Sequence, residues 1–455
     1  MENKIHDVIG VGFGVSTIGF AIALSERAEP ITFLVLEAAS VPVWQTQLLS
    51  SRVDKKRGHA RDLIAPVNPR SPFTFLNFLR IRGRLAQGSG IDAPGAVQAD
   101  YADYIRWCAQ CFASSVLHGQ QVVAISTQPL GTERALYRLQ TVSGRVFWAR
   151  HVVLGTGRAP RVPAQFVSHL GRRVVHAAQY RHATSDRSVD DAEVIAVVGA
   201  GECAVEMVLE LRDRLPSSRI ANFSWGFPYR LARAEAARYE GCFPEFIEQF
   251  YRLDRDGGNG RGESATAHHC LDEGLLLRLY GALYADQLLG RQRILMQRQK
   301  AITEVVQGPH SIGLEFRDKY SGEIEWMDVD RVVLATGFVD QAEGVDSLAR
   351  IPLLCGLVGQ GEALRPVKIG RDWQVVWSGQ PVEGVGQIYL NGVYEVQREG
   401  QDLSGQSLAL RCHAIASSVA RQLAVRRRGS GGAVSERVPA HAPQLCPDYN
   451  AVAVL

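Results

Sequence analysis

The sequence has little of what marks secreted, nucleic-acid-binding or metal-binding proteins. Eight cysteines in 455 residues are too few for a disulfide scaffold, so a reducing cytoplasm is the expected location. The net charge is only +3, and no dense run of lysine and arginine with interleaved aromatics points to nucleic acid. The residues before the first apolar run do not form a secretory leader, and no metal site is visible.

Two local patterns suggest a special function, but ordinary structure explains them better. Residues 8–24 carry no charge, yet a run of 17 residues with four glycines is too short and too glycine-rich for a membrane span. A strand, a turn and the beginning of a helix account for it, and we expect no membrane contact. Cys108 and Cys111 form a CxxC pattern in a helical stretch, where packing is a better explanation than a redox dithiol.

Length and hydrophobic periodicity predict an α/β protein of two or three domains. Residues 5–9 have the pattern of a buried strand, residues 16–27 of a helix, and residues 32–36 of a second strand. The same order returns with a strand at 194–198 and, after a second glycine turn, a helix at 202–214. We therefore predict two dinucleotide-binding, Rossmann-like domains, each opened by a β-α-β unit.

The first glycine turn, Gly10-Val-Gly12-Phe-Gly14, has the pattern of a nucleotide site. We expect Gly10 to permit the tight turn, Gly12 to let the backbone approach a pyrophosphate, and Gly14 or the small residues after it to let helix and strand pack closely. The phosphates would lie on the helix N-terminus, where free N–H groups favour negative charge. Glu37 follows the second strand, 23 residues after Gly14, and its carboxylate can accept hydrogen bonds from ribose hydroxyls.

A second turn and two further motifs indicate a second dinucleotide and a flavin. The residues expected to contact the dinucleotide at the second turn are Gly199, Gly201, Glu202 and Ala204. Residues 155–157 and 335–337 each end a buried strand in a small-Thr-Gly turn, the second containing Thr336 and Gly337. Such turns join the nucleotide domains of flavoproteins that bind two dinucleotides. The order predicts FAD first, a nicotinamide dinucleotide second, and a return to the FAD domain.

The remaining patterns complete the predicted organisation. Additional helices are expected at 72–85, 99–116 and 272–289, and additional strands near 122–126, 147–154, 312–316 and 331–335. We predict that a small helical region at 235–290 lines the substrate. The predicted segments are the first part of the FAD domain at 1–188, the nicotinamide domain at 189–330, the return to the FAD domain at 331–426, and a mobile tail at 427–455.

Several segments together resemble one flavoprotein family. The turn at 11–16, which includes Ser16, is similar to that family's flavin turn, and the residues SPFTFLNFL at 71–79, followed by RGRL, are close to its SPFSFLNYL…RGRL segment. The residues GAGECAVE at 199–206 resemble its GAGQSAAE, LATGF at 334–338 its late ATGF motif, and IYLNGV at 388–393 its penultimate strand. Over roughly residues 5–425, the chain resembles the flavin-dependent N-hydroxylating monooxygenases, the family of ornithine and lysine N-monooxygenases.

The resemblance implies FAD and NAD(P)H as cofactors and O2 as co-substrate. NAD(P)H would reduce FAD, oxygen would add to form a C4a-hydroperoxyflavin, and an uncharged primary amine would attack its distal oxygen. The protein would position the reactants and exclude water, while the flavin supplies the chemistry. The family is often dimeric or tetrameric, so the resemblance also implies a homo-oligomer.

Several positions depart from the family in the region that holds the substrate. Trp44 matches the family's tryptophan, and Lys56 stands at a glutamine that usually faces the flavin. Arg61 stands at the lysine that binds the substrate carboxylate, and Ala267 at an asparagine that helps to hold the ornithine backbone. The family's C-terminal HGLSDSLLS segment is replaced, and Arg411 follows the replacement as a further candidate substrate contact.

These departures lead to a hypothesis about the substrate. Residues 55–61 (KKRGHAR) gain basic side chains where an enzyme for a diamine should lose them, and arginine pairs bidentately with carboxylates. Our first hypothesis is therefore hydroxylation of the α-amine of L-aspartate, with further oxidation to nitrosuccinate. The alternative substrates are ornithine, lysine or a diamine. The basic residues could also simply form a solvent-exposed loop without a role in binding.

Other assignments also keep alternatives. His59 and His268 lie in segments expected to line the site, where a histidine could act as a base toward the amine. Arg230 could pair with a 2′-phosphate, so NADPH is preferred and NADH stays open. Glu202 replaces the family's glutamine and is expected to reshape the nicotinamide contact. Oxidation of a sulfur or ketone centre and a non-catalytic flavin-binding role are further alternatives.

Overall fold

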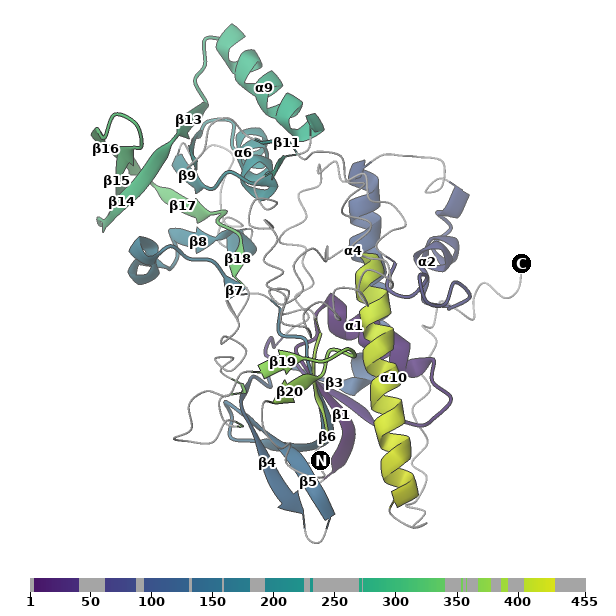
Figure 1. Cartoon of the computed structure of the whole chain (residues 1–455). Coiled ribbons are helices and arrows are strands. Elements are labelled where there is room, and N and C mark those ends of the chain that lie inside the picture. The colour runs from purple at the N-terminus through teal and green to yellow at the C-terminus, as the bar shows by residue number, and fades with distance from the viewer. Residues whose placement is uncertain are drawn as a thin grey trace.

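Two mainly parallel sheets, joined by a short pair of strands, organise the chain in its computed structural model (Figure 1). The predicted α/β class is confirmed, and both predicted β-α-β units are present. The structure describes residues 4–40, 62–86, 94–130, 133–157, 159–180, 193–224, 230–231, 270–271, 273–339, 353–354, 357, 367–377, 386–391 and 405–429.

The first sheet is built around two central parallel strands, β1 (Ile5–Val11) and β6 (Val146–Leu154). Helix α1 (Val15–Ser25) connects β1 to β2 (Phe33–Leu36), which pairs parallel with β1. The strand order is β3-β2-β1-β6-β5-β4, with β21 also paired to β6. The other strands are β3 (Val116–Leu117), β4 (Val122–Leu130), β5 (Glu133–Thr141) and β21 (Ile388–Leu390).

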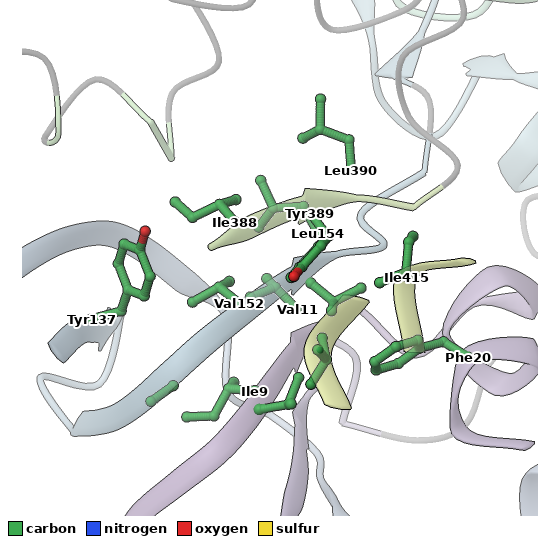
Figure 2. Close-up of a cluster of buried hydrophobic side chains, with 14 of the residues drawn as sticks. Ile9, Val11, Phe20, Tyr137, Val152, Leu154, Ile388, Tyr389, Leu390 and Ile415 are labelled. Carbon is green, nitrogen blue, oxygen red and sulfur yellow. The ribbon is translucent and has the colours of Figure 1, made fainter. Parts of the chain in front are cut away.

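Helix α10 (Gly405–Gly429) covers this sheet together with α1, so the C-terminal part of the described chain completes the N-terminal core. Figure 2 shows Ile9 and Val11 of β1, Val152 and Leu154 of β6, and residues 388–390 of β21 gathered in one cluster, with Phe20 of α1 and Ile415 of α10 against it. The last residues of both central strands, 8–11 of β1 and 152–154 of β6, are apolar and buried without alternation because helices and neighbouring segments cover both faces. The predicted tail began at residue 427, but the helix continues to Gly429.

The second sheet is fully parallel and has the order β13-β10-β9-β17-β8. Helix α6 (Glu202–Arg214) joins β9 (Val194–Val198) to β10 (Arg219–Ser224), and α9 (Glu273–Leu288) packs beside α6 on the same face. The antiparallel sheet β14-β15-β16 covers the opposite face, where the rings of Phe223 and Phe316 meet edge-on at 5.1 Å. The remaining strands are β8 (Val174–His176), β13 (Ile294–Arg298), β14 (Lys300–Gln307), β15 (Ile312–Asp318), β16 (Ile324–Val329) and β17 (Arg331–Leu334).

The chain crosses between the sheets through β7 (Ala159–Pro160) and returns through β18 (Phe338–Val339), and these two strands pair antiparallel. Figure 1 shows this pair between the two sheets. We expected residues up to 188 in the first domain and residues from 331 in the return, but β8 and β17 both pair in the second sheet. Both boundaries are corrected, because the chain crosses between the sheets directly after each small-Thr-Gly turn. The other domain limits stay predictions.

A helical layer packs on the outer face of the first unit. Helices α2 (Phe75–Ile81) and α4 (Pro94–Cys111) share a cluster of aromatic rings that includes Phe78, Tyr104 and Trp107. Cys108 and Cys111 are buried free thiols in this cluster, and burial raises the pKa of Cys108 well above its usual value. A protonated, enclosed thiol is a poor redox nucleophile, so packing explains the CxxC pattern.

Short elements complete the described chain. None of its described helices is long and apolar enough to span a membrane, and within the described residues no group of three or more His, Cys, Asp or Glu side chains is arranged to hold a metal ion. The short elements are β11 (Arg230–Leu231), β12 (Cys270–Leu271), β19 (Val367–Ile369), β20 (Val375–Trp377), η2 (Ala113–Ser115), η3 (Ala164–His169) and η4 (Ala177–Gln179).

Replacement of Ile9 by alanine should lower the free energy of unfolding by about 2–5 kcal/mol, because it leaves a cavity at the centre of the first sheet. Ile9 has 0% exposure, whereas Val142 is 65% exposed and provides the control Val142→Ala. Urea titration followed by tryptophan fluorescence measures the change, and the control should shift by less than about 0.5 kcal/mol. Equal stability of the two variants would contradict the position of the core.

Candidate functional site

The two glycine turns make matching hydrogen bonds. The Gly12 N–H donates to the Leu36 carbonyl at 2.9 Å, and the Gly199 N–H donates to the Phe223 carbonyl at 2.9 Å. The segments that follow β6 and β17 also make the same contact in each unit. The Gly155 N–H donates to the Val11 carbonyl at 2.9 Å, and the Ala335 N–H donates to the Val198 carbonyl at 2.8 Å. Gly12 of the first unit is therefore equivalent to Gly199 of the second.

This equivalence corrects the role expected for Gly10. Gly10 lies inside β1, whereas Gly12 has φ +87° and makes the turn. A Cβ on Gly12 would lie 2.7 Å from the Gly155 carbonyl oxygen, and one on Gly199 would lie 2.3 Å from that of Ala335. Both positions need glycine because the turn passes directly over the neighbouring backbone. Gly10 was the wrong choice because glycines stand at three alternate positions of the segment and nothing local marks where β1 ends.

Gly14 and Gly201 are the N-caps of α1 and α6, and, being glycines, neither supplies a side-chain cap to its helix. The first turn of α1 carries no acidic residue, so its free N–H groups and helix dipole suit a pyrophosphate. These donors would suit the phosphates of FAD, and phosphate binding at this turn stays a prediction. The first turn of α6 contains Glu202, whose negative charge disfavours a nearby phosphate and is the clearest difference between the two helix starts.

Close packing in the first unit depends on Thr17, which occupies the position of Ala204. Thr17 is fully buried, and a Cβ on Gly155 would lie 2.2 Å from its hydroxyl oxygen. We expected this packing role for Gly14 or the small residues after it. Gly14 is the N-cap, and a Cβ built there would lie 3.9 Å from the Gly155 carbonyl oxygen, so the role falls to Thr17, three residues later. The helix thus packs on the crossover through a threonine, which a glycine pattern alone does not reveal.

Glu37 follows β2 and lies directly beside the first turn. Its carboxylate accepts hydrogen bonds from the N–H groups of Phe13, at 2.5 Å, and Ala39, at 2.8 Å. Because Phe13 stands between Gly12 and Gly14, the carboxylate is fixed at the edge of the pyrophosphate cradle. A carboxylate held there could also accept from ribose hydroxyls, and this role stays a prediction.

The crossover carries two predicted cofactor residues, Thr336 and Gly337. The Thr336 hydroxyl donates to the Arg161 carbonyl, and the Arg161 N–H donates to the Gly337 carbonyl at 2.9 Å. Gly337 has φ +79° and open space where a Cβ would project. Its carbonyl also lies 2.9 Å from Nε2 of His176, on the second sheet.

His176 is held as one neutral tautomer at this crossing. Its Nδ1 accepts from the Ala178 N–H at 3.2 Å, so Nε2 carries the proton and donates to Gly337. Burial lowers the pKa of His176, which favours this neutral form. The ring also meets Phe338 edge-on at 5.1 Å. His176 therefore fixes the return strand through both a hydrogen bond and a ring contact, a role that the sequence analysis did not assign.

Arg411 lies inside the first domain, behind the start of α1. It is 6% exposed, its Nε donates to Oδ1 of Asn391 at 3.3 Å, and its guanidinium lies 5.1 Å from the ring centroid of Trp373. Asn391 in turn donates to the Ser16 carbonyl at 2.8 Å. Arg411 thus supports the α1 turn through Asn391, and a contact with substrate stays a prediction.

Asp62 anchors the chain immediately after Arg61. Its buried carboxylate accepts from the N–H groups of Ile64, at 2.9 Å, Ala65, at 2.8 Å, and Phe75, at 2.6 Å. These bonds attach the segment after Arg61 to the first residue of α2. No expectation was attached to Asp62, although an aspartate before a turn is a recognisable anchoring signal.

Several predicted site residues lie outside the described part of the chain. Arg230 is described only through its backbone, where β11 pairs with β12 and Arg230 lies opposite Cys270, two residues after His268. The predicted residues outside the described ranges are Trp44, Lys56, His59, Arg61, Ala267 and His268.

The comparisons with known proteins agree with this arrangement. The family model described as L-lysine 6-monooxygenase/L-ornithine 5-monooxygenase matches residues 4–340. The chain belongs to this family. It is therefore an enzyme of the flavin-dependent N-monooxygenase class, as the sequence resemblance predicted.

Individual relatives of this N-monooxygenase cover most of its length. The L-ornithine N(5)-monooxygenase of Pseudomonas aeruginosa is 28% identical over 357 residues, which are 74% of this chain and 79% of the relative. The solved ornithine hydroxylase from the same species is 27% identical, with a TM-score of 0.76 over 92% of this chain and 100% of that chain. The ornithine N-hydroxylase of Kutzneria sp. 744, solved with reduced FAD, NADP+ and L-ornithine, is 25% identical, with a TM-score of 0.78 over 92% and 100%.

We expect Gly12→Ala to abolish most flavin retention, because the methyl group meets the Gly155 backbone and φ is +87°. The visible flavin absorbance of the purified protein, relative to its 280 nm absorbance, measures retention. Gly144→Ala is the matched control: φ is +82° but the space around the Cβ is open, so it should cost on the order of 1 kcal/mol and keep flavin. Loss of flavin in Gly10→Ala but not in Gly12→Ala would contradict the corrected turn.

Proposed function

We propose that this N-monooxygenase uses FAD, NADPH and O2 to hydroxylate the side-chain amine of L-ornithine. The observation that carries the proposal is the likeness to the Kutzneria ornithine N-hydroxylase over 92% of this chain, because that protein was solved with reduced FAD, NADP+ and L-ornithine. The Pseudomonas relatives, also named for ornithine, support the same substrate.

The aspartate hypothesis has no support from these relatives, and the alternative that we left open is preferred. The hypothesis rested on the basic segment 55–61, which lies outside the described residues. An arginine at position 61 can pair with the α-carboxylate that ornithine and aspartate share, so it does not by itself distinguish them. Ornithine additionally presents a distal amine, the N(5) group after which the ornithine N(5)-monooxygenases are named.

Different described residues would bind each of the two cofactors. The capless start of α1 would hold the pyrophosphate of FAD, and Glu37 its ribose. The corresponding start of α6 would hold NADPH. FAD, when bound, supplies the redox and oxygen chemistry, whereas the chain binds, orients and excludes water. His176 and the β7–β18 pair fix the connection between the two sites, and Asp62 fixes the segment that follows Arg61.

Two of our remaining expectations are part of the proposal. A homo-oligomer, either a dimer or a tetramer, is expected from the family resemblance. A histidine from the predicted substrate segments, His59 or His268, would accept a proton from the ornithine ammonium so that the neutral amine can react.

Substrate panels test the proposal. The FAD-loaded enzyme is given NADPH and, in separate reactions, L-ornithine, L-lysine, putrescine or L-aspartate, and hydroxylamine product is measured per NADPH consumed. Ornithine should give tightly coupled turnover, since its amine and carboxylate are both recognised, and the other amines should mainly produce hydrogen peroxide. Coupled turnover with aspartate alone would contradict the proposal and support our first hypothesis.

Asp62→Asn should raise the KM for ornithine on the order of tenfold, while flavin content stays unchanged. The reason is that a neutral amide cannot accept the three N–H donors that anchor the segment after Arg61. Asp103→Asn removes a half-exposed carboxylate of α4, paired with Arg106 at the surface, and is the matched control. Unchanged ornithine KM in Asp62→Asn would mean that this anchor does not position the substrate.

A further inference from the structure

The two equivalent β-α-β units place Ser224 where the first unit has Glu37. The Gly12 N–H donates to Leu36, the residue before Glu37, and the Gly199 N–H donates to Phe223, the residue before Ser224. In the first unit this position holds a carboxylate that faces the glycine turn. In the second unit the same position holds a small hydroxyl side chain.

The side chain of Ser224 lies on the face of the second sheet that carries α6. Alternate residues of β10 confirm this: Ile220 packs with α6, and the Asn222 amide donates to the carbonyls of Val197 and Gly199, both at 3.0 Å. Ser224 follows two residues later, at the carboxyl end of the strand, where dinucleotides bind in parallel sheets.

An arginine stands next to Ser224 on the neighbouring strand. Arg298, the last residue of β13, pairs directly with Ser224 in the parallel ladder, so the two Cα atoms lie on adjacent strands about 4.8 Å apart. Ile294 and Met296 of the same strand pack against the α6 layer, which places Arg298 on that face as well. A guanidinium therefore adjoins the position where the first unit carries a carboxylate.

Local structure holds this arginine in place. The Arg298 Nη2 donates to the hydroxyl of Tyr280 on α9 at 3.3 Å, and its guanidinium lies 5.8 Å from the Tyr280 ring centroid. The next residue, Gln299, has φ +59°, which is unusual for a residue with a side chain. Its carbonyl accepts from the Lys319 N–H at 3.0 Å. The strand therefore ends abruptly at Arg298, at the same edge as Ser224.

We propose that Ser224 and Arg298 recognise the 2′-phosphate of the nicotinamide coenzyme, and that they select NADPH over NADH. A carboxylate at position 224 would accept from a 2′-hydroxyl and repel a 2′-phosphate, so a serine removes the repulsion. The adjacent guanidinium adds a fork of donors that suits phosphate oxygens. The inference rests on the proposed use of NADPH, and it assigns the task that we gave to Arg230 to a different arginine.

Equilibrium binding to the FAD-loaded enzyme, measured by calorimetry with NADP+ and NAD+, tests the role of Ser224. Ser224→Asp should weaken NADP+ binding about 10–100-fold and leave NAD+ binding unchanged or stronger, which corresponds to one charge-assisted contact. Ser224→Asn has the same size without the charge, and its ratio of NADP+ to NAD+ affinity should stay within about threefold of the original. The pair separates charge from any loss of folding, because both variants crowd the same buried position.

The role of Arg298 is tested with 2′,5′-ADP and 5′-AMP as probes of the adenosine half. Arg298→Met should weaken 2′,5′-ADP binding about tenfold and leave 5′-AMP unchanged, whereas Arg317→Met, on the exposed side of β15, should change neither. An equal loss for both probes, or an unchanged coenzyme ratio in Ser224→Asp, would overturn the inference while leaving NADPH as the coenzyme. If the unaltered enzyme binds NAD+ as tightly as NADP+, the proposed coenzyme itself fails.

Discussion

The fold depends on two close backbone contacts, one in each nucleotide domain, between a glycine turn and a crossover segment. Gly12 passes over Gly155 and Gly199 passes over Ala335, at distances that exclude any side chain. Each contact brings a helix start, a strand end and an interdomain connection to one edge of a sheet. The pyrophosphate cradle and the route of the chain between the domains are therefore set by the same few atoms, so a change at one alters the other.

The repeated units also show how one scaffold is adapted to two ligands. The helix starts differ by a single acidic residue, Glu202, and the strand ends differ by Glu37 in one unit and Ser224 in the other. In our proposal the backbone of each turn supplies the phosphate donors, whereas the residue at the end of the second strand selects between a ribose 2′-hydroxyl and a ribose 2′-phosphate. Selectivity would then depend on a few side chains, and phosphate binding on the backbone.

The sequence predicted the strands and helices of both units because apolar periodicity and glycine punctuation are local signals. It also predicted Glu37 beside the turn, from its distance to Gly14 along the chain. It assigned the tight turn to Gly10 because the choice depends on where β1 ends, which the distant Leu36 and Gly155 determine. The domain boundaries were misplaced for a similar reason: β17 pairs with β9 and β8 pairs with β17 between residues more than 130 positions apart, which no local pattern encodes.

The candidate site was only partly predictable. The cofactor turns follow motifs, but Asp62, Thr17 and His176 act through partners that folding brings together. Arg298 had no motif at all, since its position follows from the pairing of β13 with β10 and from the contact with Tyr280. Residues that recognise a ligand through the edge of a sheet become visible only when the strand order is known.

The antiparallel pairing of β7 with β18 has a mechanical consequence. The outgoing and returning connections between the sheets run side by side and are bonded to each other, so within the described residues the two sheets are linked at one place rather than two. A change of the backbone at this pair would therefore act on both connections at once.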